Sequence, residues 1–360
     1  MTLTNRSYQA AEAARPAVER ARLYAPRTEW TYSHHPHLTF FQGRFLAMWS
    51  NGEKDEDAPG QRVLVSASAD FLHWTPPALL MEARPGRGRT QTVLTAAGWH
   101  QYAGRLAAYV GEYEEDRSQT RLFALTSADG ATWTEPRDLH LPVIPNHGPQ
   151  ATRSGRLVIA GNFSFPTTND PAGLSGWTRS GLQPGDLGDV SDNPSSFWKI
   201  SKVSDWPTAL CEGSFFQTDD GTLQMLLRST GPAATGTLWL TECRDDGVSW
   251  SPPQETAFTD NDTKFHFGRL PDGRWYYVGC PDPKPTGLRS PLVLSVSENG
   301  TDFHRHFLLG DDRYERRRPG RWKDGQFGYP HTMVQDGNLC VIVSRRKEAV
   351  QVLRVALNDL

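Results

Sequence analysis

Histidine, carboxylate, arginine and tyrosine side chains recur at matching places in this chain, at the starts or ends of short apolar segments. The residues at the starts are His34, His35, His37, His147, Glu212, His266, Tyr329 and His331. The residues at the ends include Glu112, Asn162, Arg228 and Arg345. Guanidinium groups bind carboxylates through paired hydrogen bonds, and imidazole and carboxyl groups transfer protons. Gathered on one rim, these side chains could bind an anion and carry out acid–base chemistry.

A turn repeat shows which elements must position them. A glycine followed by an apolar segment occurs six times, at intervals of 61, 51, 66, 52 and 64 residues: Gly43, Gly104, Gly155, Gly221, Gly273 and Gly337. We expect each glycine to adopt positive φ in a hairpin turn between two strands. The start of the first strand and the end of the second then share one face. The candidate residues therefore fall on the same face in every unit.

A second signature follows in several units, at residues 68–74, 127–133, 243–250 and 297–303. In residues 127–133, Asp129 precedes Gly130, and Trp133 follows. The carboxylate is expected to cap a tight turn, while the glycine supplies positive φ. The aromatic side chain is expected to pack between neighbouring sheets. These turns stabilise a local fold, and we assign them no catalysis.

Six units of about 59 residues predict an all-β fold, a six-bladed β-propeller. Two packed sheets would not produce a period that runs through the whole chain. The sixth unit is short, so a strand near residues 19–24 should complete it. Residues 10–22 are expected to form a small helix. The predicted division is an N-terminal segment, residues 1–28, and a catalytic propeller, residues 29–360.

Composition excludes several classes of protein. The 38 Lys and Arg against 41 Asp and Glu give a net charge of −3, which does not favour nucleic-acid binding. No apolar run is long enough to span a membrane, and the first residues lack a hydrophobic signal core. The four cysteines lack metal-ligand spacing and are expected to be reduced. We expect a cytoplasmic enzyme, or a secreted one if a signal was removed, without a cofactor or metal. The oligomeric state is not predicted.

The aspartate turns resemble the Asp-box repeats of sialidases, and five segments extend the resemblance. Residues 328–332, with Tyr329, resemble the segment that carries the sialidase nucleophile, and residues 211–213, with Glu212, the segment of its activating glutamate. Arg228, 16 residues later, and Arg289 resemble two arginines that hold the sugar carboxylate. Asp57 resembles the acid/base aspartate. The resemblance covers residues 33–344.

This resemblance implies an exo-acting glycoside hydrolase that removes a terminal acidic sugar. A phenol with a pKa near 10 is a poor nucleophile, so Glu212 would take the proton of Tyr329. Asp57 would protonate the leaving oxygen. One departure stands out. Where sialidases have a third arginine, this chain has His34 and His35, which lack the permanent charge and the fork of a guanidinium.

Two other functions stay open. A lyase or rhamnosidase acting on uronate-containing glycans would use His34, His37, Tyr329, His331 and Arg228, with the arginine neutralising the uronate. A propeller that only binds glycans is the other. The remaining expected substrate contacts are made by His35, His37, His147, His266, His331 and Arg345. Two long loops, residues 164–197 and the arginine-rich residues 311–328, are expected to flank the site, where the second could attract an anionic substrate.

Overall fold

The computed structural model describes residues 3–6, 8–87, 90–182 and 208–360. Strands dominate the described residues, and the one helical element among them is a short 3₁₀ turn, η1 (Leu357–Asp359). The predicted all-β class is confirmed. None of the described helical residues could form a membrane-crossing helix.

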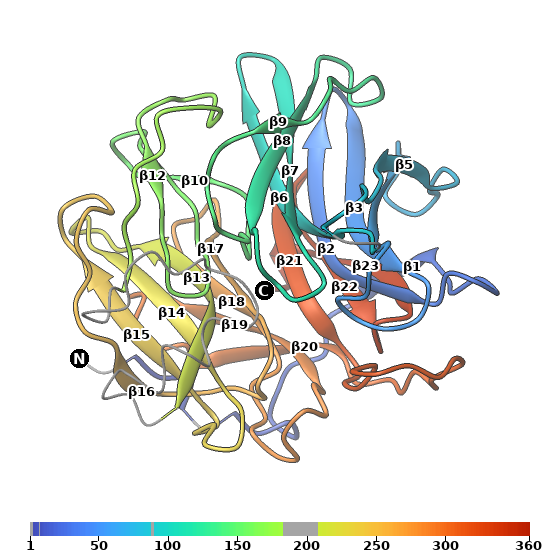
Figure 1. Cartoon of the computed structure of the whole chain (residues 1–360). Helices are drawn as coiled ribbons and strands as arrows, with labels where there is room; N and C mark the ends of the chain where they lie inside the picture. Colours follow the sequence, from blue (N-terminus) through green and yellow to red (C-terminus); the bar gives the residue numbers. More distant parts are fainter. Residues whose placement is uncertain (1–2, 7, 88–89, 183–207) are drawn as a thin grey trace.

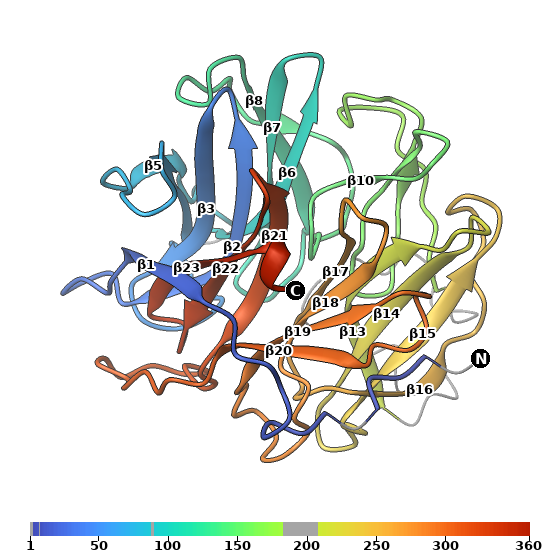
Figure 2. The ribbon, with the colours of Figure 1, turned by 180° about the vertical axis from the view of Figure 1, so that it is seen from behind.

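Within the described residues, the strands form six antiparallel sheets, arranged around a common centre (Figures 1 and 2). The first sheet contains β2 (Tyr32–Phe41), β3 (Arg44–Gly52), β4 (Arg62–Ser68) and β5 (Ala78–Met81). The second contains β6 (Val93–Tyr102), β7 (Arg105–Tyr113), β8 (Arg121–Ser127) and β9 (Arg137–Asp138). The third contains β10 (Gln150–Ala151), β11 (Leu157–Val158) and β12 (Thr167–Thr168).

The other three sheets have four strands each. The fourth contains β13 (Ala209–Gln217), β14 (Leu223–Thr230), β15 (Thr237–Cys243) and β16 (Gln254–Thr259). The fifth contains β17 (His266–Arg269), β18 (Trp275–Gly279), β19 (Leu292–Ser297) and β20 (Arg305–Gly310). The sixth contains β21 (Gly328–Gln335), β22 (Asn338–Arg345), β23 (Ala349–Ala356) and β1 (Val18–Tyr24). In this last sheet β1 pairs antiparallel with β23, so the two ends of the described chain share one sheet.

The expected N-terminal helix is wrong. Residues 10–12 form a turn, in which the backbone N–H of Glu12 donates to the carbonyl of Gln9 at 3.0 Å. Ala14 then pairs with β20, donating to His306 and accepting from Leu308. Pro16, which lacks an N–H, would remove a donor from a helix here. Ala14 therefore lies in an extended stretch that pairs with the fifth sheet, not in a helix.

Apolar side chains fill the space between every two neighbouring sheets. Leu46 and Met48 of the first sheet pack with Leu94 and Val110 of the second, for example. Comparable clusters join the second sheet to the third, the third to the fourth, the fourth to the fifth and the fifth to the sixth. A further cluster joins the sixth sheet back to the first. Burial of these side chains is the main force holding the sheets together.

The turns have the predicted geometry. All six repeat glycines adopt positive φ, between 70° at Gly337 and 95° at Gly273. In the second signature, Asp129 accepts backbone N–H groups from Ala131 and Thr132 at 2.8 and 2.7 Å. Phe303, at the end of another copy, is fully buried between the fourth and fifth sheets. The four cysteines are free and buried: Cys211, Cys243, Cys280 and Cys340.

Candidate active site

A β-bulge recurs in the innermost strands and aims side chains into one pocket. The register shifts between His34 and His37 in β2, between Cys211 and Ser214 in β13, and between Gly328 and His331 in β21. Inside these bulges, His35, Glu212 and Tyr329 have φ values of 52°, 52° and 53°. A bulge bends the strand and redirects a side chain, and left-handed non-glycine residues are concentrated at functional sites.

Tyr329, Glu212 and Arg228 form a connected group. The hydroxyl of Tyr329 donates to Oε1 of Glu212, and Nη1 of Arg228 donates to Oε2 of the same carboxylate. Nη1 of Arg228 also lies 3.3 Å from the Tyr329 hydroxyl, and its Nε donates to Asp262 at 2.6 Å. The predicted pairing of Tyr329 with Glu212 is therefore present. Charge-assisted hydrogen bonds of this kind fix orientation as well as charge.

The environment of the pocket shifts the pKa values of Glu212 and Tyr329 in opposite directions. Burial alone would raise the pKa of Glu212, but the charge of Arg228 and the hydrogen bond from Tyr329 hold it below its ordinary value of 4.5. Burial, and then the negative charge of Glu212, raise the pKa of Tyr329 well above 10. Glu212 is thus a carboxylate at neutral pH, and Tyr329 is a neutral phenol that donates to it.

Asp57 has a different environment in the same pocket. Its Oδ1 accepts from the Tyr113 hydroxyl at 2.5 Å, and its Oδ2 accepts from Arg117 at 3.1 Å. Burial, and then the nearby charge of Glu56, raise the pKa of Asp57 to about 6. Glu56 in turn pairs with Lys347 at 2.5 Å. A carboxyl group with this pKa can both give and take a proton near neutral pH.

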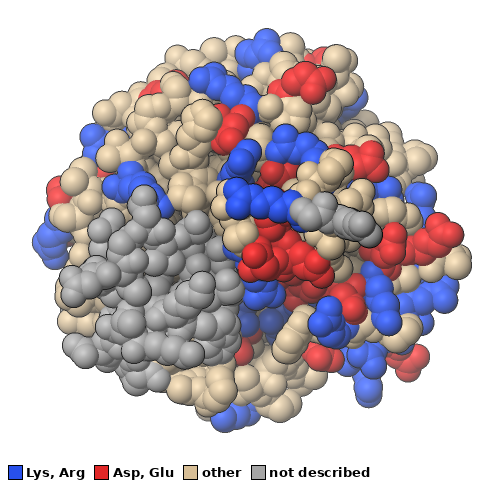
Figure 3. All heavy atoms as spheres, in the orientation of Figure 1, with Lys and Arg blue, Asp and Glu red and all other residues tan. Residues whose placement is uncertain are grey.

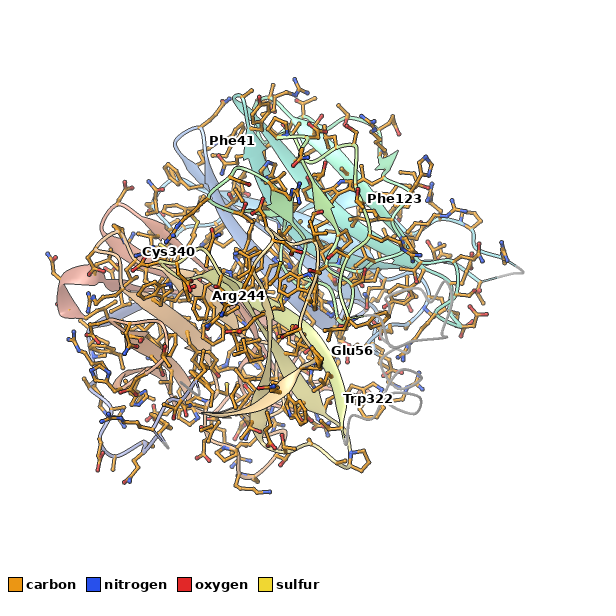
Figure 4. The ribbon with its side chains drawn as sticks, turned by 90° about the vertical axis from the view of Figure 1, so that its left-hand side faces the viewer. Phe41, Glu56, Phe123, Arg244, Trp322 and Cys340 are labelled. Carbon is orange, nitrogen blue, oxygen red and sulfur yellow. The ribbon has the colours of Figure 1, made fainter. Side chains whose placement is uncertain are left out.

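One pocket of about 470 Å³ collects these groups. Its charged lining residues are Glu56, Asp57, Arg117, Glu212, Arg228, Asp262, Lys264, Arg289, Asp324 and Lys347. On the face shown in Figure 3, acidic side chains gather near the centre, with basic side chains beside them. Figure 4 shows Glu56 and Trp322, both lining the pocket, together on one side of the molecule and away from Cys340. The pocket therefore belongs to one face of the ring of sheets.

Arg289 lies on the same pocket, as predicted, at φ 52°. Its Cζ is 5.6 Å from the centre of the Tyr329 ring. Its backbone N–H donates to Asn261 at 2.7 Å, which positions the side chain. Nε and Nη1 of Arg289 are buried without a hydrogen-bond partner among the described residues.

His34 and His35 occupy different positions although they are adjacent. His35 lines the pocket, and the centre of its ring lies 5.3 Å from the centre of the Tyr329 ring. His34 is fully buried, with Nδ1 2.7 Å from the Ser344 hydroxyl and its ring 4.0 Å from Tyr329, but it does not line the pocket. Where a third arginine is expected from the resemblance to sialidases, this chain thus has one imidazole that lines the pocket and one that is packed beneath its wall.

Four further histidines meet beneath the pocket: His37, His266 and His331 from the first, fifth and sixth sheets, and His147 from the segment that precedes the third. Two of them accept an N–H from the next sheet: Nδ1 of His266 from Thr332 at 2.9 Å, and Nδ1 of His331 from Leu38 at 3.3 Å. Ser214 accepts in the same way from Phe267 at 3.0 Å. These contacts join the inner strands of neighbouring sheets. None of the four histidines lines the pocket.

Arg345 also lies apart from the pocket. It is buried, pairs with Asp312 at 2.9 Å, and its Cζ lies 4.1 Å from the centre of the Phe327 ring. It contributes to a separate cleft lined by Tyr314 and by several arginines of the 311–328 loop. Of the other predicted loop, residues 183–197 lie outside the described residues.

Sequence reasoning missed several charged residues of the pocket: Glu56, Asp262, Lys264 and Lys347. Asp262 and Lys264 precede the fifth sheet, four and two residues before His266, which the sequence pattern indicated. The strand-start rule that selected His266 would have found them if it had been extended toward the loop. Lys347 lies in the turn between β22 and β23, where the sequence gives no comparable signal.

The fold and site together define an all-β protein whose pocket holds a phenol, a carboxylate hydrogen-bonded to it, and cations without a carboxylate partner among the described residues. A model of the BNR repeat-like domain matches residues 43–341, so the chain belongs to the BNR repeat-like domain family. No curated protein sequence matches this chain.

Solved structures share the fold at low sequence identity. A sialidase superposes with a TM-score of 0.60 at 18% identity, over 99% of this chain and 34% of its own. A protein of unknown function from Dyadobacter fermentans superposes with a TM-score of 0.65 at 15% identity. The match covers 94% of this chain and 100% of that protein. Trypanosoma rangeli sialidase superposes with a TM-score of 0.66 at 13% identity, over 94% of this chain. The present chain spans 59% of that sialidase. The likeness to sialidases is one of fold.

Proposed function

We propose that this protein is a sialidase-like glycoside hydrolase that removes a terminal acidic sugar from an oligosaccharide. The observation that carries the proposal is the hydrogen bond from Tyr329 to Glu212, in a pocket that also holds Asp57. A phenol paired with a carboxylate base, with a second carboxyl group of raised pKa nearby, is a nucleophile and acid/base set.

In the first step, the oxygen of Tyr329 bonds to the anomeric carbon as the glycosidic bond breaks. The phenol proton passes to Glu212, and Asp57 gives its proton to the leaving oxygen. In the second step, Asp57 takes a proton from water, whose oxygen attacks the anomeric carbon. Tyr329 leaves and recovers its proton from Glu212. A neutral phenol approaches an anionic sugar with less repulsion than a carboxylate would.

The proposed architecture is a six-bladed β-propeller, in which each sheet is a blade and the aspartate turns are Asp-boxes. The ring of clusters between neighbouring sheets supports it, because the sixth sheet packs on the first. A closed ring places the inner strands around a central axis, so that the proposed catalytic residues lie at the ends of these strands.

The lyase alternative has less support. His37 and His331, which would supply it, lie beneath the pocket, and His34 is packed away from it. A lyase would also leave Glu212 without a task, although it is the residue that Tyr329 and Arg228 both contact.

The test is to incubate the protein with sialyl, other ulosonic and uronyl-rhamnosyl oligosaccharides. The expected product is a released acidic monosaccharide without the ultraviolet absorbance of an unsaturated uronate. Glu212→Gln should remove most turnover, while the exposed control Glu135→Gln, with the same change of charge, should not. An unsaturated product, or normal turnover by Glu212→Gln, would favour the lyase. No product from any substrate would support a binding propeller.

A further inference from the structure

The cations of the pocket differ in whether a carboxylate already neutralises them. Arg228 bonds to both Glu212 and Asp262. Lys347 pairs with Glu56, and Arg117 with Asp57. These three cations are therefore committed to carboxylates of the protein. A substrate anion that relied on them would have to compete with ion pairs already formed.

Lys264 differs from these three cations. It precedes β17 and lines the pocket at 2% exposure, yet it forms no hydrogen bond or ion pair within 4.0 Å with any described residue. Its Nζ lies 5.2 Å from the centre of the Tyr329 ring. A buried ammonium group without a partner is costly, and a bound anion would offset that cost.

Arg289 faces the same ring. Its Cζ lies 5.6 Å from the centre of the Tyr329 ring, and its buried Nε and Nη1 have no partner among the described residues. Both unpaired cations thus lie beside the proposed nucleophile, where a carboxylate next to the reacting carbon would be. A guanidinium binds such a group through two donors, and an ammonium adds a third.

We propose that Lys264 is an anion-binding residue of this pocket, and that the carboxylate of the substrate binds between Lys264 and Arg289, beside Tyr329. This inference rests on the proposed function, because it names the group that makes the sugar acidic. Lys264 and Arg289 come from the fifth sheet and its loops, so one sheet supplies both free charges. Arg228 then positions Glu212 and does not bind the substrate carboxylate.

The subsite is sensitive to pH. Burial lowers the pKa of Lys264 to about 7, against a smaller opposing effect of Glu212. The titratable or charged groups that face Lys264 are Glu212, Tyr329, His34, His35, His37, His147, His266 and His331. Burial lowers the pKa of all six histidines, so they stay neutral where Lys264 titrates. Affinity for an anion should therefore fall as the pH rises through about 7.

The experiment measures binding rather than turnover. Glucuronate, N-acetylneuraminate and their methyl esters are titrated into the full chain by calorimetry. Wild type should bind at least one acid more tightly than its ester. Lys264→Met should weaken binding of that acid about 10- to 100-fold, the usual value of one charged hydrogen bond, and leave the ester unchanged. Lys264→Arg should restore binding and remove the loss of affinity above about pH 7.

Lys284→Met removes an exposed charge that does not line the pocket and should change neither affinity. The inference is overturned if Lys264→Met keeps the wild-type ratio of acid to ester affinity, or if wild type binds neither acid. If Lys264→Met does not fold, a pH-independent wild-type ratio overturns it instead. Acid binding that depends on Lys264, without any hydrolysis, would contradict the proposed hydrolase and leave the subsite standing.

Discussion

Tyr329 and Glu212 occupy the same bulge position in two different innermost strands, with φ values of 53° and 52°, and are hydrogen-bonded to each other. The left-handed backbone turns both side chains out of the pleat toward one pocket. Their nearest strand neighbours, Cys211 and Gly328, are buried in the sheets. The proposed nucleophile and its base are therefore each positioned by a β-bulge of the same kind.

Tyr329 and Glu212 should act as a unit. Tyr329→Phe and Glu212→Gln are each expected to lower kcat about 10²- to 10⁴-fold, because each removes the proposed nucleophile or its proposed base. The double variant should be no slower than the slower single variant, since residues that act together are not additive. Steady-state kinetics on one active substrate checks this. Additive losses would show that the two residues act independently.

Asp57 should control the alkaline side of the pH profile. With a pKa of about 6, it is protonated below that value and loses its proton above it. If it donates to the leaving oxygen, turnover falls as the pH rises through about 6. Asp57→Asn should remove this dependence and slow natural glycosides far more than aryl glycosides with acidic leaving groups. Equal losses on both substrates would contradict the role of acid.

The all-β class and its turns could be predicted because turn chemistry is local. Positive φ at Gly43 or Gly337 follows from the residue type and its place between two apolar segments, and the structure shows both. The prediction of an N-terminal helix was wrong because the structure there depends on distant residues. Ala14 belongs to a stretch whose backbone pairs with β20, far away in sequence, and tertiary pairing overrides a modest helix propensity.

The site could be predicted only in part. Glu212 and Tyr329 lie at strand starts, a place that the turn repeat identifies. Lys264 and Lys347 become part of the pocket only when different sheets meet, and the sequence does not show which cation a carboxylate will neutralise. The bulges were also missed, because a single unpaired residue leaves the alternation of apolar side chains almost unchanged.

The histidines beneath the pocket should make the fold sensitive to acid. Burial lowers the pKa of His266 from 6.5 to about 3. A base whose pKa is lowered by folding stabilises the fold above its unfolded pKa, and this stability is lost as the pH falls from 6.5 toward 3. His266 alone should contribute about 2 kcal/mol of the loss by pH 5. Urea unfolding at several pH values measures it, and His266→Asn should reduce the slope.

Arg228 and Arg345 are both buried arginines with carboxylate partners, and exchanging each for methionine should separate catalysis from stability. Arg228→Met leaves Glu212 and Asp262 without their cation, so the pKa of Glu212 should rise and turnover should be lost. The unpaired carboxylates should also cost about 3–5 kcal/mol of unfolding free energy. Arg345→Met breaks a pair with the half-exposed Asp312, outside the pocket. It should lower Tm and leave kcat and KM near wild type. A raised KM in Arg345→Met, with Tm unchanged, would instead place Arg345 on the substrate.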